Sequence, residues 1–292
     1  MRNALIILIK DEIKGIVHLF DQIPFNKFDE VLAIDGMSTD GSAEFLKNKG
    51  IKVITQTVRG RGQAFRDAFN NTDSDLLLFF GPDGNEDPAD IEKFIKEFEN
   101  NENAGMIVAR RLGPGAVNKE DVKLFKPRKW VNIAFNVVAN LLWNRNSYIY
   151  DTINGFRAIT RKTWDKIGVD ADGYTVEYQS TIRCFKNSIS IVEFPTHELQ
   201  RIGVKAGSPA LHTGVSFIKL FLNEILISIL KTLKKLNPLE LKLRIEELRT
   251  KYSHNQQLRL EYYNSLFTKF NKGKTEEFDK ETPIYRGKVR EL

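Results

Sequence analysis

The chain has 292 residues, of which 41% are hydrophobic, enough for one large core with an appended segment. Its one cysteine, Cys184, excludes an internal disulfide framework and a thiolate metal cluster, and a reducing compartment is expected. The net charge of +6 at pH 7 favours an anionic partner: a nucleic acid, a nucleotide, a lipid phosphate or a membrane surface.

The sequence predicts neither a signal peptide nor a spanning helix. The first apolar run, Ala4–Ile9, is too short for a signal peptide and leads directly into charged residues. No uninterrupted stretch reaches the roughly 18 apolar residues that a membrane-spanning helix needs. We therefore expect a soluble or membrane-surface protein.

Short apolar strands alternate with helical patterns over the first hundred residues. The predicted strands are Ala4–Ile9, Val31–Ile34, Ile51–Thr55, Asp75–Phe80 and Gly105–Ala109. Continuous apolar strands, each followed by a helix, are typical of a mostly parallel sheet that is covered on both faces. The predicted fold class is therefore α/β, of a nucleotide-binding type.

The fourth strand ends in a loop that presents a carboxylate and an amide, Asp83 and Asn85. Asp87 then follows as the expected N-cap of the next helix, with a proline at its first position. In an open α/β sheet this place is the usual ligand crevice, and oxygen donors there suit a divalent cation that carries a diphosphate. An ordinary strand-to-helix turn would use the same residue types.

Two common nucleotide motifs are missing from the sequence. The first strand leads into KDEIKGI rather than G-x-G-x-x-G, and no P-loop pattern occurs. The loop that contains Arg59 and Arg61 offers a flexible glycine backbone and two guanidinium groups, which suit a phosphate or a base edge.

Six short motifs follow one another in the sequence. They are D-x-x-S-x-D-G at 35–41, G-K/R-G-x-A at 60–64, a match to D-x-D-G-x-x-D-P at 81–88 with Gly81 at its first position, D-x-x-x-G-F-R at 151–157, E-F-P at 193–195 and R-x-G-x-K at 201–205. In this order they resemble the family 2 glycosyltransferases with the GT-A fold, and particularly the branch of polyprenyl-phosphate (dolichyl-phosphate mannose or glucose) synthases. The resemblance covers about residues 4–207 and implies a GT-A sheet flanked by helices.

The resemblance implies a divalent cation, Mg²⁺ or Mn²⁺, held by Asp83 with Asn85 as a neighbouring ligand. The cation would neutralise the leaving diphosphate. The first aspartate of the motif is Gly81 in this chain, so Asp83 is the aspartate that remains. A nucleotide-binding pseudoenzyme is the alternative that this departure leaves open.

The resemblance also implies roles for other charged side chains. Asp35 would accept a hydrogen bond from the nucleobase, and Glu12 would contact the nucleotide together with Arg59 and Arg61. Glu177 and Asp151 would lie near the sugar acceptor, where either carboxylate could act with Asp83 in catalysis.

The acceptor decides which of these groups is essential. An attacking hydroxyl needs a base, which Asp151 or Glu177 would supply. A lipid phosphate is already ionised near neutral pH and needs cations to hold it beside the anionic donor. The cations expected in that role are Arg128, Arg157, Arg201 and Lys205.

The rest of the chain favours a membrane surface. The segment Trp130–Trp143 is apolar except for an asparagine stripe, and we expect a helix that either lies in a membrane interface or covers the sheet. A second amphipathic helix is predicted over Val215–Leu236. The charged helical segment Leu239–Phe270 could dock on the catalytic domain, pair with another chain as a homo-oligomer, or lie on lipid.

We therefore expect a catalytic domain at 1–211, with a nucleotide-sugar-binding half at 1–111 and an acceptor half at 112–211. The segment 212–292 would be a helical extension. The expected activity is metal-dependent, inverting sugar transfer from a nucleotide-diphosphosugar to a polyprenyl phosphate, at the cytoplasmic face of a membrane. The alternative is transfer to a saccharide hydroxyl. A sugar-1-phosphate nucleotidyltransferase is disfavoured because no Gly-rich loop follows the first strand. A nucleic-acid partner is disfavoured because the positive residues are dispersed.

Overall fold

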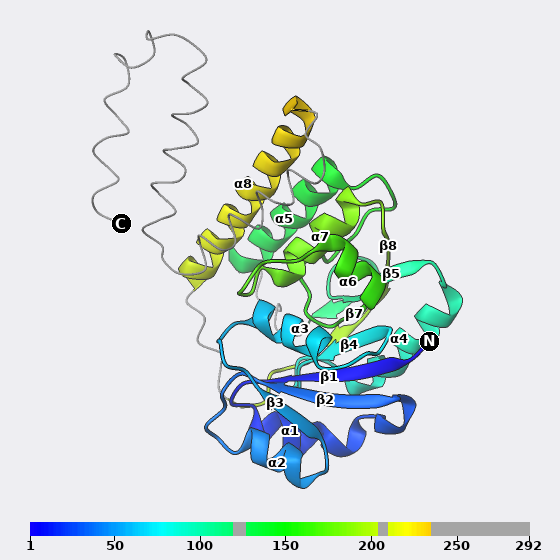
Figure 1. Ribbon diagram of the computed structural model, residues 1–292, viewed down its shortest axis with the longest axis vertical. Helices are drawn as coiled ribbons and strands as arrows, with labels where there is room; N and C mark the ends of the chain where they lie inside the picture. Colours follow the sequence, from blue (N-terminus) through cyan, green and yellow to red (C-terminus); the bar gives the residue numbers. More distant parts are fainter. Residues whose placement is uncertain (119–126, 204–209, 235–292) are drawn as a thin grey trace, which may run out of the picture. The chain divides into compact units, whose positions relative to one another are not determined.

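The computed structural model describes residues 1–118, 127–203 and 210–234. A seven-stranded sheet in the order β3-β2-β1-β4-β7-β5-β8 forms its centre (Figure 1). β7 runs antiparallel to its neighbours β4 and β5, and the other pairs are parallel. The strands are β1 Asn3–Ile9, β2 Glu30–Asp35, β3 Lys52–Thr55, β4 Leu76–Phe80, β5 Ala104–Arg110, β7 Arg157–Thr160 and β8 Ser190–Pro195.

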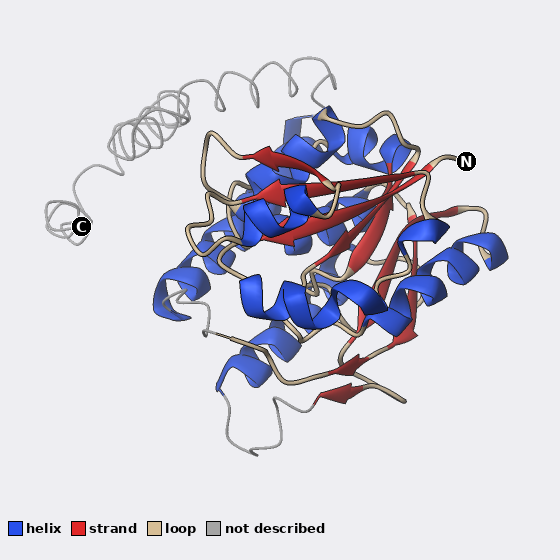
Figure 2. Ribbon diagram, turned by 90° about the horizontal axis from the view of Figure 1, so that it is seen from below, coloured by secondary structure: helices blue, strands red, loops and turns tan. Residues whose placement is uncertain are grey.

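Helices cover both faces of this sheet (Figure 2). One face packs against α1 Ile13–Leu19, α2 Ser42–Asn48 and α4 Ile91–Asn100. The other face packs against α3 Arg61–Asn70, α6 Arg161–Ile167 and α7 Val176–Lys186. The short 3₁₀ helices are η1 Phe20–Gln22, η2 Phe25–Lys27 and η3 Pro88–Asp90. The remaining elements are β6 Val117–Asn118, α5 Pro127–Trp143, β9 His197–Glu198 and α8 Ala210–Lys234.

The side chains of β4 show why the sheet needs cover on both faces. Leu78 and Phe80 belong to the core on the α4 side, whereas Leu77 and Phe79 belong to the core on the α3 side. Phe79 stacks on Phe65 of α3 with ring centroids 3.9 Å apart. All five β4 residues are buried, because successive strand side chains point to opposite faces and helices cover both faces. The predicted mostly parallel, doubly covered sheet is confirmed.

The helix after β4 begins as the sequence predicts. The Asp87 side chain accepts a hydrogen bond from the backbone N–H of Ala89 at 2.9 Å, and Pro88 follows the cap. The first turn is the 3₁₀ helix η3, which continues into α4. This cap fixes the length of the loop between β4 and the helix, and with it the position of Asp83.

The asparagine stripe of α5 binds a neighbouring loop. Asn136 donates to the carbonyl of Tyr150 at 2.7 Å and accepts from the N–H of Thr152 at 3.0 Å. Asn140 donates to the carbonyl of Ile149 at 2.8 Å and accepts from its N–H at 2.9 Å. The polar side of α5 therefore faces the protein. Within the described residues α5 packs against α7, where Phe135 contacts Tyr178, and its expected position in a membrane interface stays a prediction.

Contacts between residues divide the chain into two units, Met1–Phe221 and Leu222–Leu292. Helix α8 contains the division, and the predicted domain boundary at residue 211 stays a prediction. Within α8, Thr213–Leu230 has a mean hydropathy of 1.6 and is, by length and composition, able to cross a membrane. Lys219, Asn223 and Glu224 interrupt this window, so the expectation of no uninterrupted apolar stretch of about 18 residues is not contradicted. The predicted helix at 239–270 lies outside the described residues.

Candidate functional site

Three acidic residues lie at the same edge of the sheet, each at or just after the carboxyl end of a strand. Asp35 is the last residue of β2, Glu12 follows β1 and Asp83 follows β4. These three strands are adjacent and parallel, in the order β2-β1-β4, so their carboxyl ends meet. This is the crevice in which open α/β sheets bind their ligands.

Arg201 joins two of these carboxylates although it is far from both in the sequence. Its Nη1 lies 3.3 Å from Oδ2 of Asp83, and its Nη2 contacts Oε1 of Glu12. Burial raises the pKa of Glu12 to about 7; the guanidinium lowers it and the charge of Asp83 raises it. The Nε of Arg201 is buried and has no hydrogen-bond partner among the described residues.

The loop 83–85 is held from one side by the segment that contains Arg201. The N–H of Ile202 donates to the carbonyl of Asp83 at 2.7 Å, and the N–H of Leu199 donates to the carbonyl of Asn85 at 2.9 Å. Gly84 has a φ of +92°, and a Cβ there would lie 2.7 Å from Ile202. Only glycine combines this backbone conformation with so close an approach.

The donor atoms of this loop fit a divalent cation. Oδ1 of Asp83 accepts from the N–H of Asn85 at 2.9 Å, which orients the carboxylate. Oδ1 of Asn85 is buried and has no donor within the described residues, which is costly unless a ligand occupies it. No group of three or more His, Cys, Asp or Glu side chains that could hold a metal occurs in the part of the chain that the structure describes. Substrate oxygens would have to complete the coordination.

A second carboxylate of the loop, Glu86, was not singled out by the sequence analysis. Its Oε2 accepts a hydrogen bond from the N–H of Gly81 at 2.6 Å. Burial, with the nearby charge of Asp83, raises the pKa of Glu86 to about 8. Glu86 stands at a position of the D-x-D-G-x-x-D-P motif at which any residue is allowed, so the motif does not mark it.

A cavity of about 350 Å³ opens beside this loop. Its charged and polar lining residues are Arg61, Asp83, Asn85, Glu86, Arg111, Asn132, Asn154, Tyr174, Glu177, Thr196, Glu198 and Thr213. Its apolar lining residues are Val131 and Phe135 of α5, Ile153 and Phe156 of the loop before β7, and Phe217 of α8, together with Gly155 and Gly214. Phe135 and Phe217 contact each other with ring centroids 5.4 Å apart.

Arg61 and Glu177, expected at the donor and the acceptor respectively, form an ion pair in this cavity. The Nε of Arg61 contacts Oε1 of Glu177, which is 3% exposed. Arg61 also lies so close to Gly155 that a Cβ there would overlap its guanidinium. The pair links the N-terminus of α3 with the N-terminal turn of α7 across the cavity.

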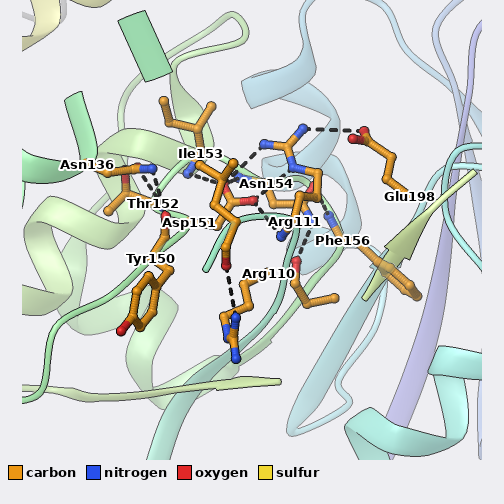
Figure 3. A network of polar contacts seen from close by, with 12 residues as sticks. Arg110, Arg111, Asn136, Tyr150, Asp151, Thr152, Ile153, Asn154, Phe156 and Glu198 are labelled. Atoms are coloured by element: carbon orange, nitrogen blue, oxygen red, sulfur yellow. Dashed lines mark hydrogen bonds and ion pairs between the residues drawn. The ribbon is translucent and has the colours of Figure 1, made fainter. Parts of the chain in front are cut away.

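Asp151 is buried and fully engaged (Figure 3). Its two oxygens receive Nε and Nη2 of Arg111 at 2.8 and 3.1 Å, and the backbone N–H groups of Arg111 and Asn154 at 3.0 Å each. Arg111 also lies 3.6 Å from Glu198. Burial raises the pKa of Asp151, but Arg111 and the backbone donors outweigh it and hold the pKa below its usual value. This arrangement positions Arg111 at the cavity wall and does not leave Asp151 free to accept a proton.

Arg157 is part of the core, which contradicts the expectation that it binds an acceptor phosphate. Its guanidinium is 0% exposed and donates to the carbonyls of Asn154 and Glu177 at 2.7 and 2.8 Å and to Oγ of Ser180 at 2.8 Å. Burial lowers its pKa to about 10. Arg157 therefore anchors α7 to the loop before β7.

The other expected site residues are placed as follows. Asp35 is buried and accepts from the N–H of Ser38 at 2.9 Å and from Oγ1 of Thr55 at 3.2 Å. Arg59 is exposed and does not line the cavity. Two expected acceptor contacts cannot be placed: the side chain of Arg128 and all of Lys205 lie outside the described residues.

The raised pKa of Glu193, in the E-F-P motif, can be tested through the pH dependence of stability. It accepts the N–H groups of Tyr150 and Asp151 at 2.8 Å each, and burial raises its pKa to about 7. Between about pH 4.5 and pH 7 the folded state therefore holds more protons than the unfolded state, and the free energy of unfolding falls as pH rises.

We expect urea unfolding of Glu193→Gln to show a smaller loss of stability than the parent across that pH window. Glu12 and Glu86 titrate in the same direction, so a residual slope should remain in the variant. Glu102→Gln, at an exposed position, is the control and should keep the slope of the parent. An unchanged slope in Glu193→Gln would contradict the assignment.

The sequence analysis did not identify two further residues that line the cavity, Arg111 and Glu198. Arg111 directly follows β5, so the rule that points to the carboxyl ends of strands could have found it. Glu198 belongs to the short pair of β6 and β9, which no sequence pattern marks.

Comparisons with known proteins agree on the family and the fold. The family model "Glycosyl transferase family 2" matches residues 9–158. Glycosyltransferase AglJ of Haloferax volcanii is 28% identical over 179 residues, which cover 58% of this chain and 54% of the relative. This chain thus matches about half the length of that curated relative.

Solved structures of glucosyl-3-phosphoglycerate synthase from Mycobacterium tuberculosis share the fold. The complex with Mn²⁺, uridine diphosphate and phosphoglyceric acid has a TM-score of 0.61 at 16% identity, covering 76% of this chain and 78% of that chain. The complex with Mn²⁺ and UDP-glucose has a TM-score of 0.58 at 17% identity, covering 79% and 78%. The expected GT-A type of fold is confirmed. Because the family model covers slightly more than half of the residues, the chain belongs to glycosyl transferase family 2.

Proposed function

We propose that this protein transfers a sugar, with inversion, from a nucleotide-diphosphosugar to a polyprenyl phosphate at a membrane surface. The observation that carries the proposal is the mixed lining of the cavity. Charged side chains, among them Asp83 and Arg111, line it together with the aromatic rings of Phe135 and Phe217. A lipid phosphate likewise combines a charged head with an apolar chain.

On the donor side we propose that Asp83 and Asn85 hold Mg²⁺ or Mn²⁺. The cation would supply the positive charge that stabilises the leaving diphosphate. Asp35, Glu12 and Arg59 remain the proposed nucleotide contacts. Support comes from the orphaned oxygen of Asn85 and from the M. tuberculosis synthase, which was crystallised with Mn²⁺ and uridine diphosphate.

On the acceptor side, the state of the carboxylates favours a phosphate nucleophile. Glu177 is paired with Arg61, and Asp151 is saturated by Arg111 and backbone donors, so neither expected base is free. An ionised phosphate needs no strong base, whereas it does need cations. Arg61 and Arg111 line the cavity and Arg201 lies beside Asp83; each is paired with a carboxylate, with which an acceptor phosphate would share the guanidinium group.

Transfer to a hydroxyl is the second candidate. The M. tuberculosis synthase was crystallised with phosphoglyceric acid, so the same fold accommodates a small acceptor that bears a phosphate. Glu177, if released from Arg61, would then be the base. A nucleotide-binding protein without transfer activity is the third candidate, because Gly81 replaces an acidic residue of the motif.

The apolar side of α5 supports a membrane-surface location. Trp130, Ala134, Val137 and Leu141 recur at the spacing of one helix face and are exposed, whereas the asparagines on the other side bind the protein. An apolar helix face of this kind suits the interface of a bilayer. Figure 1 shows α1 and α2 at the opposite end of the sheet from α5 and α7.

Liposome co-sedimentation tests this surface. Leu141 is 76% exposed, so Leu141→Glu should leave the fold intact and weaken binding to anionic liposomes by placing a charge in the apolar layer. Val17 on α1 is also apolar and exposed, at 54%, and Val17→Glu is the matched control that should bind as the parent does. Equal binding of all three proteins would remove α5 from the membrane contact.

The activity itself is tested with a panel of nucleotide sugars and two kinds of acceptor, a short polyprenyl phosphate and a set of saccharides. Product masses identify both the sugar and the acceptor. A glycosylated polyprenyl phosphate is the expected product. A glycosylated saccharide would select the second candidate, and nucleotide binding without any product would select the third.

A further inference from the structure

We propose that Glu86 supplies the acidic group that Gly81 lacks, so that Asp83, Asn85 and Glu86 together form this protein's contact with the cation and its diphosphate. The inference rests on the proposed metal-dependent function and deepens it. It concerns a residue that the D-x-D motif itself does not specify.

The position of the Glu86 carboxylate relative to Gly81 is the first argument. A Cβ built on Gly81 would lie 3.6 Å from Oε1, 3.7 Å from Cδ and 3.8 Å from Oε2 of Glu86. The carboxylate therefore fills the space into which a side chain at position 81 would project. A carboxyl group is present at this place in the fold, but it arrives from five residues downstream.

The hydrogen bonds of Glu86 show that this placement is built into the loop. The N–H of Gly81 donates to Oε2 at 2.6 Å, which fixes the carboxylate over the end of β4. Oε1 receives no hydrogen bond from the residues that the structure describes, and Glu86 lines the same cavity as Asp83 and Asn85. One oxygen is thus used for positioning and the other is available to a ligand.

The Glu86 side chain, rather than the backbone conformation, gives a reason for glycine at position 81. Gly81 has no positive φ, so its conformation does not by itself demand glycine. An aspartate at 81 would extend past Cβ toward the Glu86 carboxyl group, and two carboxyl groups in contact disfavour each other's ionised form. Glycine at 81 and glutamate at 86 are therefore coupled, since a carboxyl group at either position would use the same space.

This coupling gives a test that does not depend on turnover. Free Mn²⁺ is measured by electron paramagnetic resonance while Mn²⁺ is titrated into the protein at a fixed, saturating concentration of uridine diphosphate. Glu86→Gln keeps an oxygen that can accept from Gly81, so it should fold, and it should weaken Mn²⁺ binding by about tenfold to a hundredfold. Glu99→Gln, exposed on α4, is the matched control and should bind as the parent does.

The double variant Gly81→Asp with Glu86→Gln should recover Mn²⁺ binding to within a few-fold of the parent. Gly81→Asp alone should bind less well than that double variant, because the two carboxylates then compete for one space. Parent-like binding by Glu86→Gln would overturn the inference and leave the proposed function standing. Absence of Mn²⁺ binding by the parent, with or without the nucleotide, would instead overturn the proposed metal dependence and the inference with it.

Discussion

Asp83→Ala is expected to lower the rate of sugar transfer by orders of magnitude while leaving the fold intact. Asp83 is the aspartate that remains of the D-x-D pair, and its carboxylate lies in the loop that holds the orphaned Asn85 oxygen. If Asp83 holds the cation as proposed, its loss would remove the positive charge that stabilises the leaving diphosphate. The measurement is the initial rate of transfer as a function of Mn²⁺ concentration, with a chelator added at the end of each series.

The control for this experiment is Asp73→Ala. Asp73 is an exposed aspartate before β4, and it should keep parental rates. Asp83 also neutralises Arg201, so circular dichroism and thermal unfolding should accompany the rates to show that the variant is folded. Near-parental transfer by Asp83→Ala that is insensitive to the chelator would show that the cation is held elsewhere or is not used.

Features that depend on residues close together in the sequence, such as strands and helix starts, could be predicted with little error. The run from 75 to 80 predicts a strand buried on both faces, and the Asp87-Pro88 pair predicts the start of the helix. Both predictions hold because burial on two faces and helix capping are decided by neighbours along the chain. The loop that presents Asp83 follows from these two boundaries.

Contacts between distant segments could not be predicted in this way. Arg157 belongs to a glycosyltransferase motif, yet its guanidinium donates hydrogen bonds to α7 and to the loop at 152–154 rather than binding a substrate. Arg61 and Glu177 were expected at different substrates, yet they pair across the cavity. In each case the role of the side chain depends on which distant segment folds against it, and one sequence does not contain that information.

The asparagine stripe of α5 illustrates the same limit for a whole helix. The spacing of the asparagines correctly predicts that α5 has a polar side and an apolar side. It does not predict which of the two sides packs against the protein. Since Asn136 and Asn140 bind backbone groups of the loop 149–152, the polar side is buried and the apolar side is exposed. The exposed apolar side of α5 supports the proposed contact with a membrane surface.

The acceptor is decided by comparing Arg201→Ala with Glu177→Gln. The buried Nε of Arg201 has no partner among the described residues, and a phosphate oxygen would satisfy it. A charge-assisted contact made in the transition state is worth roughly 1.5–3 kcal/mol. Arg201→Ala should therefore slow transfer to polyprenyl phosphate by about tenfold to more than a hundredfold, while slow hydrolysis of the donor continues.

Glu177→Gln should cost much less with the same acceptor, because an ionised phosphate needs no base. A glutamine also keeps an oxygen that can accept from Arg61, so the cavity should keep its shape. If a hydroxyl is the acceptor, the order reverses, and Glu177 becomes indispensable while Arg201 becomes secondary. Rates for both variants with both acceptors, and donor hydrolysis measured in parallel, distinguish the cases. Parental transfer by Arg201→Ala, together with an inactive Glu177→Gln, would rule out the lipid phosphate, since a nucleophile that is already ionised has no use for the carboxylate.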